Sequence, residues 1–552
     1  MAEKDRKYST QAVADEFLKQ GGNVSATARS LGLARSTVQK ALRKTKLLKK
    51  PVAGGSHKGF SDTTKGALPP KGIVKRYICT SAQNNTYVNK EFWEALLLLA
   101  DHYSAEILVG SFSYNMNAYG PSAVKLGTHE GKPVETYDKD PWFDPAVKPY
   151  LNDKSIELAD GLVWCGEMNI MPTAVNPLAG LETYTHRKSA IFPHAKVAMR
   201  SIATLPSEGT KLNYTTGTVT LKNYIQKKEG IKAEHHHKYG ALLVEVDAKG
   251  YWAARQVGWS EGDQSLQDLD VLVKNGQLTT GNTIEAITWG DLHGTAAEEW
   301  VVELSQEILD TLRPKYQFLH DVMEGASTNP HVIKAAPDAH YGYNRWLRGL
   351  HRVDEELRRT TELLKRYLRP WCQTIVPDSN HDHMWLRRWL LKYDYRYDPA
   401  NAELFLDLQK WFYERIKENT AKGLSHKEIN LSAYAFAKYG LTEQDVKFLL
   451  PDESFTILNK KIECGVHGHL GANGGFGTPE KLAVIGRRMN TAHTHSACII
   501  NGLYVAGTSS KLIWSYNWGF SSWSHTHILT YPNGQRTLIT MYEKKWRAKE
   551  TQ

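Results

Sequence analysis

The sequence is poor in cysteine and has no long apolar run. Its 552 residues include five cysteines, which are scattered and form no Cys-x-x-Cys pair. This argues against a disulfide framework or a cysteine-based zinc site and favours a reducing compartment. The longest apolar run, residues 95–100, is far shorter than the ~20 residues of a membrane-spanning helix, and the N-terminus lacks the apolar core of a signal peptide. We therefore expect a cytoplasmic protein with no membrane partner.

The sequence also lacks the glycine-rich motifs that cradle nucleotide phosphates. Residues 73–112 predict a strand, a helix and a second strand, and further strands are predicted near residues 161–167, 196–205 and 241–258. Neither GxxxxGK[ST] nor GxGxxG follows any of them. We interpret residues 73–283 as an α/β scaffold or substrate-side domain. The histidine run at 235–237 predicts a surface loop, because three adjacent side chains point in different directions on a regular element.

Positive charge is concentrated at one end of the chain. Residues 1–50 contain twelve Lys or Arg and four Asp or Glu, and residues 51–72 add three Lys against one Asp. The first 72 residues therefore carry the whole formal charge of +10, and the other 480 sum to zero. A basic head on a neutral body predicts a tethered module that binds a polyanion.

Three short helical patterns occupy residues 10–20, 24–31 and 36–44 of this head. Gly21-Gly22 and Gly32 separate them, and Asn23 and Ser36 are suitable helix caps. Residues 1–45 resemble the helix-turn-helix family, which implies that the third helix enters the DNA major groove. The resemblance implies DNA contacts by Arg35, Thr37, Gln39, Lys40 and Arg43. The alternative is a solvated three-helix bundle that contacts protein. Residues 46–72, rich in Gly, Pro and Lys, predict a flexible basic linker.

Five later segments carry metal-binding residue types, most of them directly after an apolar run. They read D-x-H, D, N-H-D, H and H-x-H along the chain. A helical pattern at 298–312 separates the first two predicted strands, so the acids that follow these strands should meet at the carboxyl edge of a parallel sheet. The residues are Asp291, His293, Asp321, Asn380, His381, Asp382, His467, His493 and His495.

This series resembles the calcineurin-like metallophosphoesterase family over residues 284 to about 515. The resemblance implies a binuclear site in which one metal is held by Asp291, His293 and His495, and the other by Asn380, His467 and His493. It implies that Asp321 bridges the metals and that a metal-bridging hydroxide attacks the phosphoester. It also implies that His381, oriented by Asp382, faces the scissile phosphate. Mixed Asp, Asn and His ligands suit Mn²⁺, with Fe or Zn as alternatives.

The motifs depart from the family pattern at several positions. His320, Ser379 and Ala492 stand where the family has glycine, and the second acid of the second motif is shifted to Glu324 or absent. His469 competes with His467 as a ligand, and we favour His467 because it directly follows the predicted strand. A second H-x-H, His525 and His527, lies in an alternating hairpin around Pro-Asn-Gly, and we interpret both as structural.

Residues 341–450 predict a helical insertion in the catalytic domain, which spans residues 284–552. Its aromatic residues mostly have the spacing of a helical core. Arg345, Arg348, Arg387 and Arg388 are the side chains we expect to be available to phosphate.

The predicted fold is an α/β (α+β overall) chain with a layered metallophosphoesterase core. The leading functional hypothesis is a two-metal-dependent DNase that its head brings to DNA. The alternatives are a phosphomonoesterase, a nucleotide phosphodiesterase, or a DNA-binding regulator with a degenerate phosphoesterase body. The layout also resembles early DNA-transfer and DNA-degradation proteins of T5-like phages, which implies action in the host cytoplasm. A homo-oligomer is compatible with the sequence.

Overall fold

The computed structural model divides the chain into two compact units, Met1–Thr63 and Thr64–Gln552. The described residues are 9–20, 24–33, 35–45, 63–114, 125–129, 132–136, 142–328, 339–396, 399–425, 428–514, 517 and 519–549. Most of the predicted linker (46–62) and the predicted cap Asn23 lie outside them.

The first unit contains three helices, α1 (Thr10–Lys19), α2 (Val24–Leu31) and α3 (Arg35–Lys44). Ser9 caps α1, since its hydroxyl accepts a hydrogen bond from the Ala12 amide at 3.1 Å. The third helix begins one residue before the predicted cap Ser36. The core of this unit includes Ala28, Val38 and Leu42, and α1 adds the side chains Val13, Ala14 and Phe17. Apolar residues of all three helices therefore hold this small unit together.

A seven-stranded sheet begins the second unit, counted over the described residues. Its order is β15-β14-β13-β12-β11-β2-β3, and β2 and β3 are parallel strands joined by α4. The predicted βαβ unit at 73–112 is confirmed. The elements are β2 (Lys75–Gln83), α4 (Lys90–Tyr103), β3 (Glu106–Phe112), β11 (Gly240–Val246), β12 (Trp252–Ser260), β13 (Ser265–Asp268), β14 (Val271–Lys274) and β15 (Gln277–Thr279).

A second sheet joins strands from the two halves of the chain. Its described strands have the order β1-β6-β7-β8-β10-β9-β23-β24-β22-β21-β20, and the antiparallel pair β9–β23 connects the early strands to the late ones. The elements are β1 (Thr64–Lys65), β6 (Ser155–Ala159), β7 (Leu162–Cys165), β8 (Ser189–Phe192), β9 (Met199–Ile202), β10 (Lys211–Thr215), β20 (Thr456–Ile457), β21 (Ile462–Glu463), β22 (Met489–Thr491), β23 (Cys498–Ile500) and β24 (Leu503–Val505). A separate described hairpin comprises β4 (Lys125–His129) and β5 (Lys132–Thr136).

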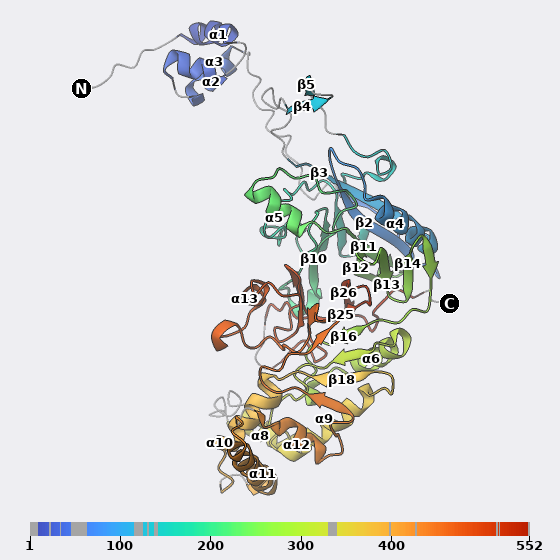
Figure 1. Cartoon of the computed structure of the whole chain (residues 1–552), viewed down its shortest axis with the longest axis vertical. Coiled ribbons are helices and arrows are strands. Elements are labelled where there is room, and N and C mark those ends of the chain that lie inside the picture. Colours follow the sequence, from blue (N-terminus) through green and yellow to red (C-terminus); the bar gives the residue numbers. More distant parts are fainter. Residues whose placement is uncertain are drawn as a thin grey trace, which may run out of the picture. The chain divides into compact units, whose positions relative to one another are not determined.

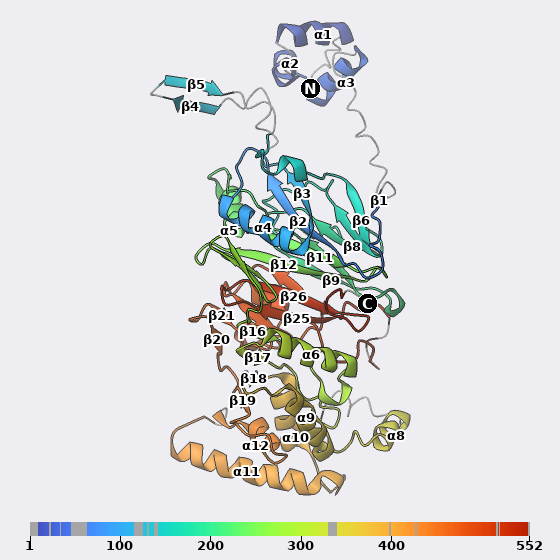
Figure 2. The same cartoon turned by 90° about the vertical axis from the view of Figure 1, so that its right-hand side faces the viewer.

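A third sheet has the described order β19-β18-β17-β16-β25-β26, with β16 to β19 parallel and β25 and β26 antiparallel. Neighbouring side chains of β16 alternate between its faces: Ala286 packs toward β20 and β21, whereas Ile287 packs toward the helices. Figures 1 and 2 show α6, α9 and α12 near this sheet, and β12 beside β26. The bounds are β16 (Ala286–Thr288), α6 (Glu299–Leu312), β17 (Tyr316–Phe318), α9 (Val353–Tyr367), β18 (Gln373–Val376), α12 (Leu431–Ala437), β19 (Val446–Phe448), β25 (His525–Thr530) and β26 (Arg536–Met541).

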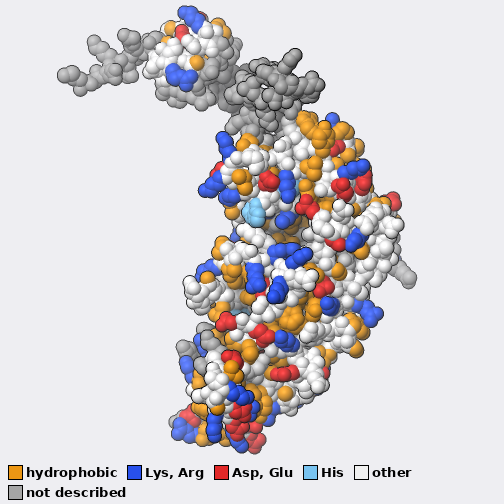
Figure 3. Space-filling model, in the orientation of Figure 1, with side chains coloured by type: hydrophobic (Ala, Val, Ile, Leu, Met, Phe, Trp, Pro, Cys, Tyr) orange, Lys and Arg blue, Asp and Glu red, His pale blue; other side chains and the backbone are white. Residues whose placement is uncertain are grey.

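The predicted helical insertion at 341–450 consists of crossover connections of this third sheet. Helices α8 (Ala339–Leu347) and α9 lie between β17 and β18, and α10 (Leu386–Lys392), α11 (Ala402–Ala421) and α12 lie between β18 and β19. The predicted core role of its aromatics holds for Trp385, Trp389 and Phe405, which are buried. Lysine, arginine and acidic side chains are intermixed on the lowest part of the surface in Figure 3, where α11 lies.

The predicted surface loop at the histidine run is wrong. His235 and His236 form the last turn of α5 (Lys228–His236), and His237 follows it with only 4% of its surface exposed. The two ring nitrogens of His237 lie 2.7 Å from the Tyr224 hydroxyl and 2.9 Å from the Thr220 carbonyl oxygen. Because the helix ends here, the third side chain turns inward and finds polar partners.

The α/β class is confirmed, with mixed sheets and helices along the described chain. Among the described helices, none is both long and apolar enough to cross a membrane.

Arg255 joins two acidic side chains inside the first sheet, and its loss should destabilise the second unit. Its Nε and Nη2 donate to Asp268 at 2.5 and 2.8 Å, and its Nη1 lies 3.0 Å from Glu245. Arg255→Ala leaves the buried Asp268 carboxylate without its cation and leaves Glu245 with Arg76 alone, so urea titration followed by circular dichroism should show a loss of about 3–5 kcal/mol. Lys274→Ala, which breaks an exposed pair with Asp263, should cost less than about 1 kcal/mol. Equal effects of the two changes would contradict this role.

Candidate metal centre

The predicted ligands all follow strands and meet at neighbouring strand ends. Asp291 and His293 follow β16, Asp321 follows β17, and Asn380 and His381 follow β18 in a π-helical turn (Asn380–Trp385). From the second sheet, His467 follows β21 and His493 and His495 follow β22. Carboxyl ends of parallel strands form the edge where open α/β sheets bind ligands. The site therefore lies where the second and third sheets meet.

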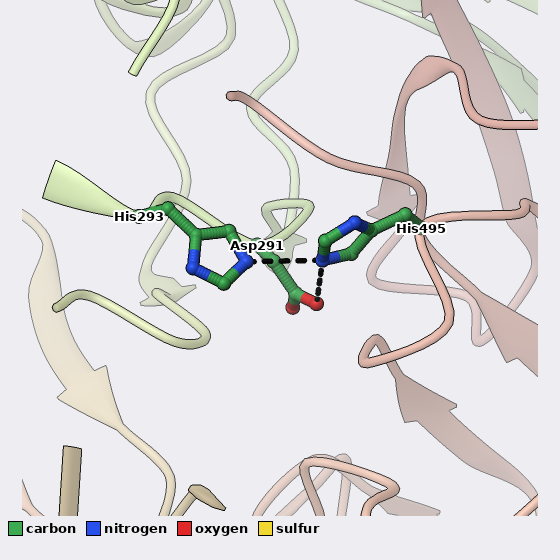
Figure 4. Close-up of side chains that lie close together, drawn as sticks. All are labelled: Asp291, His293 and His495. Atoms are coloured by element: carbon green, nitrogen blue, oxygen red, sulfur yellow. Dashed lines mark hydrogen bonds and ion pairs between the residues drawn. The ribbon is translucent and has the colours of Figure 1, made fainter. Parts of the chain in front are cut away.

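Asp291, His293 and His495 form the first cluster. His495 Nε2 lies 3.0 Å from Asp291 Oδ2 and 3.0 Å from His293 Nε2. Figure 4 shows the three side chains converging on one point, Asp291 and His293 from one loop and His495 from another. One ligand atom from each residue lies within 4.8 Å of the others, a spacing that fits a shared cation.

Asp321, His467 and His493 form a second cluster with the same spacing. His467 Nε2 lies 3.2 Å from Asp321 Oδ2, whereas His469 belongs to no such cluster among the described residues. This geometry places His467 and not His469 in the cluster. The amide oxygen of Asn380 is buried and has no hydrogen-bond partner.

His381 lies beside both clusters, but Asp382 does not orient it. His381 Nε2 is 3.7 Å from Asp321 Oδ2, and its Nδ1 is 2.6 Å from the Glu324 carbonyl oxygen. Asp382 instead accepts hydrogen bonds from the backbone amides of Val322 and Met323 at 3.0 and 2.7 Å. The prediction that Asp382 backs His381 is therefore wrong. Asp382, in the turn after the neighbouring strand β18, thus fixes the loop that follows Asp321.

Four site residues have left-handed backbone conformations. The φ angles of His293, Asp321, His493 and His495 are 48°, 40°, 76° and 57°. This region is sparsely populated by residues other than glycine, and each instance costs roughly 1–3 kcal/mol. Such strain persists only where surrounding structure imposes it, and it concentrates at functional sites.

A close backbone contact holds the Asp291 loop against the segment that follows β24. A Cβ on Gly290 would lie 2.6 Å from the backbone of Gly507, so glycine is required for this approach. The Gly290 amide donates to His527 Nδ1 at 3.0 Å. His525 Nδ1 lies 3.0 Å from the Thr508 carbonyl oxygen. Both histidines of the second H-x-H thus support the backbone around the site, as their predicted structural role requires.

The electrostatics of the site favour neutral imidazoles and a local deficit of positive charge. Burial lowers the pKa of His495 to about 4 and that of His293 well below its usual range. Burial and the neighbouring Asp321 carboxylate raise the pKa of Asp291 well above its usual range. Burial opposes ionisation of Asp321 too, but the facing His381 and His467 rings hold its pKa well below the usual range. Neutral imidazole and carboxylate oxygen are the forms that ligate metals.

The donor set fits a pair of divalent cations. Asn380 Oδ1 is buried without a hydrogen-bond partner, although buried polar atoms are normally satisfied, and the two acids and four histidines of the two clusters supply the other donors. Nitrogen and oxygen donors without thiolate suit Mn²⁺, Fe or Zn.

Two buried groups near the site were not predicted from the sequence. His320, singled out only as a glycine replacement, lies with its Nδ1 3.2 Å from His467 Nδ1. Glu356 accepts backbone hydrogen bonds from Gly325, Ala326 and Ser327 at 2.6, 3.2 and 3.0 Å. For His320, the only sequence signal of a place near the site was that it directly precedes Asp321. Glu356 gave no such signal, because it lies on α9 in a different part of the chain.

The four arginines predicted to be available to phosphate divide into two that make structural contacts and two that are exposed. Arg345 donates to the carbonyl oxygen of Ala326, and Arg387 packs over the Phe412 ring at 5.3 Å, so both hold structure together. Arg348 and Arg388 are exposed.

All five predicted DNA-contacting residues lie on α3 of the first unit. Thr37 and Lys40 are exposed there. The side chains of Arg35, Gln39 and Arg43 lie outside the described part of the chain.

Removing the Asp382 carboxylate should destabilise the loop that presents Asp321. In Asp382→Ala the two buried backbone amides lose their acceptor, at a cost of about 1–3 kcal/mol each. Asp382→Asn keeps one acceptor oxygen and should lose less. Asp394→Ala, which removes an exposed partner of Arg396, serves as the control in urea denaturation. An Asp382→Ala protein as stable as this control would contradict the assigned role.

No protein-family model and no solved structure matches the chain. Protein A1 of Escherichia phage T5 is 37% identical to it over 486 residues, which cover 86% of this chain and 83% of that protein. The predicted relation to a protein of a T5-like phage is thereby confirmed. With this identity over most of both proteins, the chain belongs to the family of phage T5 Protein A1.

Proposed function

We propose that this protein is a two-metal-dependent DNA phosphodiesterase with a metallophosphoesterase-type core. The observation that carries the proposal is the convergence of two Asp/His clusters, each with ligand atoms within 4.8 Å, at the ends of parallel strands. A third group, His293, Asp321 and His381, has the same spacing and lies between them, because it shares a residue with each. Five separate segments supply these side chains, which argues for one functional site.

Asp291, His293 and His495 would hold one cation, and Asn380, His467 and His493 the other, with Asp321 shared. Divalent cations bound in such a pair polarise phosphoryl oxygens and generate a nucleophile from water at neutral pH. The protein's contribution is to keep its imidazoles neutral and its carboxylates fixed on strained loops.

His381 is the proposed proton-transfer residue. The Glu324 carbonyl oxygen only accepts hydrogen bonds, so the neutral His381 ring carries its proton on Nδ1, 2.6 Å away. Its Nε2 is then left to accept a proton beside Asp321 or, after protonation, to donate one to a leaving oxygen. The Trp385 ring packs against His381 with centroids 3.6 Å apart and restricts its orientation.

The basic first unit supports DNA as the substrate of the proposed phosphodiesterase. Its third helix carries exposed Thr37 and Lys40, and residues 1–72 hold the whole net positive charge of the chain. Such a module increases the local concentration of a polyanion, whereas a small phosphomonoester gains little from it.

The proposed activity can be tested with purified protein, Mn²⁺, DNA, bis-p-nitrophenyl phosphate and p-nitrophenyl phosphate. We expect cleavage of both diesters, loss of activity with EDTA, and loss of bound metal in His467→Ala. His469→Ala is the matched control because it removes a neighbouring histidine outside the clusters, and it should retain metal. His381→Ala should keep its metal and lose roughly 10²–10⁴-fold in rate. Monoester turnover without diester cleavage would reject the proposal.

Deleting residues 1–63 should weaken DNA binding without abolishing diester hydrolysis. These residues form a separate compact unit, so the remainder should fold alone. Because phosphate contacts release counterions, the truncated protein should also show a shallower dependence of DNA affinity on salt. Affinity can be measured by fluorescence anisotropy at several salt concentrations, with bis-p-nitrophenyl phosphate turnover as the control. An unchanged salt dependence would rule out DNA binding by this unit.

A further inference from the structure

Aromatic side chains border both clusters of the candidate metal centre. Phe476 lies near His493 in the second cluster, and Trp514 and Trp523 lie near His293 and His495 in the first. Aromatic rings supply no ligand atom to a divalent cation, so metal binding does not explain their presence. Their positions point to the substrate.

Phe476 stands at the end of a narrow glycine-rich loop. Leu470 and Phe476 form an antiparallel bridge, and the Gly471 amide donates to the Gly475 carbonyl oxygen at 2.7 Å. The Phe476 ring centroid is 5.8 Å from that of His493, yet 68% of the residue is exposed. A large apolar side chain left in water beside a polar site is unusual and suggests a binding surface.

Trp514 and Trp523 lie against the first cluster. The ring of Trp514 is 5.0 Å from His293, and the ring of Trp523 is 4.1 Å from His495. The indole nitrogen of Trp514 donates to the Lys511 carbonyl oxygen at 2.5 Å, and its backbone amide donates to Asn517 at 2.6 Å. Both indoles are half-buried, so a ring held in position still reaches the solvent.

Two aromatic borders suit a phosphate that is esterified on both sides. A DNA phosphodiester carries a nucleoside on each of its two ester oxygens, and nucleobases stack on aromatic side chains regardless of sequence. A base inside a duplex is already stacked and presents only its edge, so it must be unstacked before it meets these rings. A phosphomonoester would engage at most one border.

We propose that Phe476 and Trp514 stack the two nucleobases that flank the scissile phosphate, so that the substrate is single-stranded or frayed DNA. Trp523 supports this arrangement by packing against both Trp514 and His495. The inference rests on the proposed phosphodiesterase function and adds its substrate class and two specificity-determining residues.

The test compares Phe476→Ala and Trp514→Ala on a short single-stranded oligothymidylate and on bis-p-nitrophenyl phosphate. Each variant should lose roughly 5- to 100-fold in kcat/KM on the oligonucleotide, from the loss of one stacked base. Hydrolysis of bis-p-nitrophenyl phosphate, which has no base, should be unchanged. Trp514→Phe keeps a ring and should recover most of the loss. Duplex DNA should be cut more slowly than its separated strand.

Phe520→Ala is the matched control, because Phe520 is 72% exposed and has no ring contact with a site histidine among the described residues. It should behave as the unaltered protein. Equal kcat/KM on the oligonucleotide for all variants, or equal rates on duplex and single strand, would overturn the inference. Parallel losses on both substrates would also overturn it, because the rings would then act on the metal centre.

A second readout is independent of catalysis. A single-stranded oligonucleotide that contains 2-aminopurine should lose fluorescence on binding the protein in EDTA, because stacking quenches this base. Phe476→Ala and Trp514→Ala should reduce the quenching, and Phe520→Ala should not. Quenching that depends on these rings, in a protein that hydrolyses no diester, would uphold the stacking surface while rejecting the proposed function. Quenching unaffected by either change would overturn the stacking surface itself.

Discussion

Asp291 and Asp321 are buried carboxylates at adjacent strand ends, and much of the surrounding structure is arranged to keep them there. Burial raises the free energy of a charged carboxylate, and the two groups disfavour each other's ionisation. The chain surrounds them with histidines whose own charged forms burial disfavours. Such an arrangement lacks positive charge, which bound cations would supply. The left-handed conformations of Asp321 and three of the histidines are a further cost that the fold sustains at this one place.

The scaffold meets this constraint by joining two sheets at the site. Parallel strands of the third sheet deliver the acids, His293 and His381, and strands of the second sheet deliver His467, His493 and His495. The contact between Gly290 and Gly507 holds the Asp291 loop to the segment after β24, and the hydrogen bond from Gly290 to His527 holds it to β25. Asp382 performs the equivalent task for the Asp321 loop. Loop positions are thereby set by buried polar contacts, which suits a site that must be rigid.

Histidines of this chain have different roles because their surroundings differ. His495 and His527 are both buried, yet one points its Nε2 at Asp291 and the other accepts a hydrogen bond from backbone. His381 differs from both because its Nδ1 lies in hydrogen-bond contact with the Glu324 carbonyl oxygen, and this contact determines which ring nitrogen carries the proton. The aromatic borders extend the site beyond its polar residues and would give an otherwise unspecific phosphoester centre a preference for unstacked bases.

The sequence by itself determined the order of the elements and the candidates for the site. Apolar runs followed by Asp, Asn or His predict strand ends that carry ligands. This signal can be recognised in the sequence alone because each motif consists of residues close together in the chain. It also separated His493 and His495 from His525 and His527, since the hairpin signal around Pro-Asn-Gly is local too. The charge imbalance of residues 1–72 required only counting.

The tertiary structure decided which group touches which. Asp382 adjoins His381 in the chain, but the π-helical turn directs its carboxylate to Val322 and Met323 and leaves His381 to the Glu324 carbonyl. Different segments of the chain bring four further residues to the site: His320, Glu356, Phe476 and Trp514. No local sequence pattern predicts that these residues lie close together. The helices predicted as an insertion are crossover connections of the third sheet, because strand pairing depends on residues far apart in the chain. Local patterns thus identify the chemistry available, and long-range packing selects the atoms that perform it.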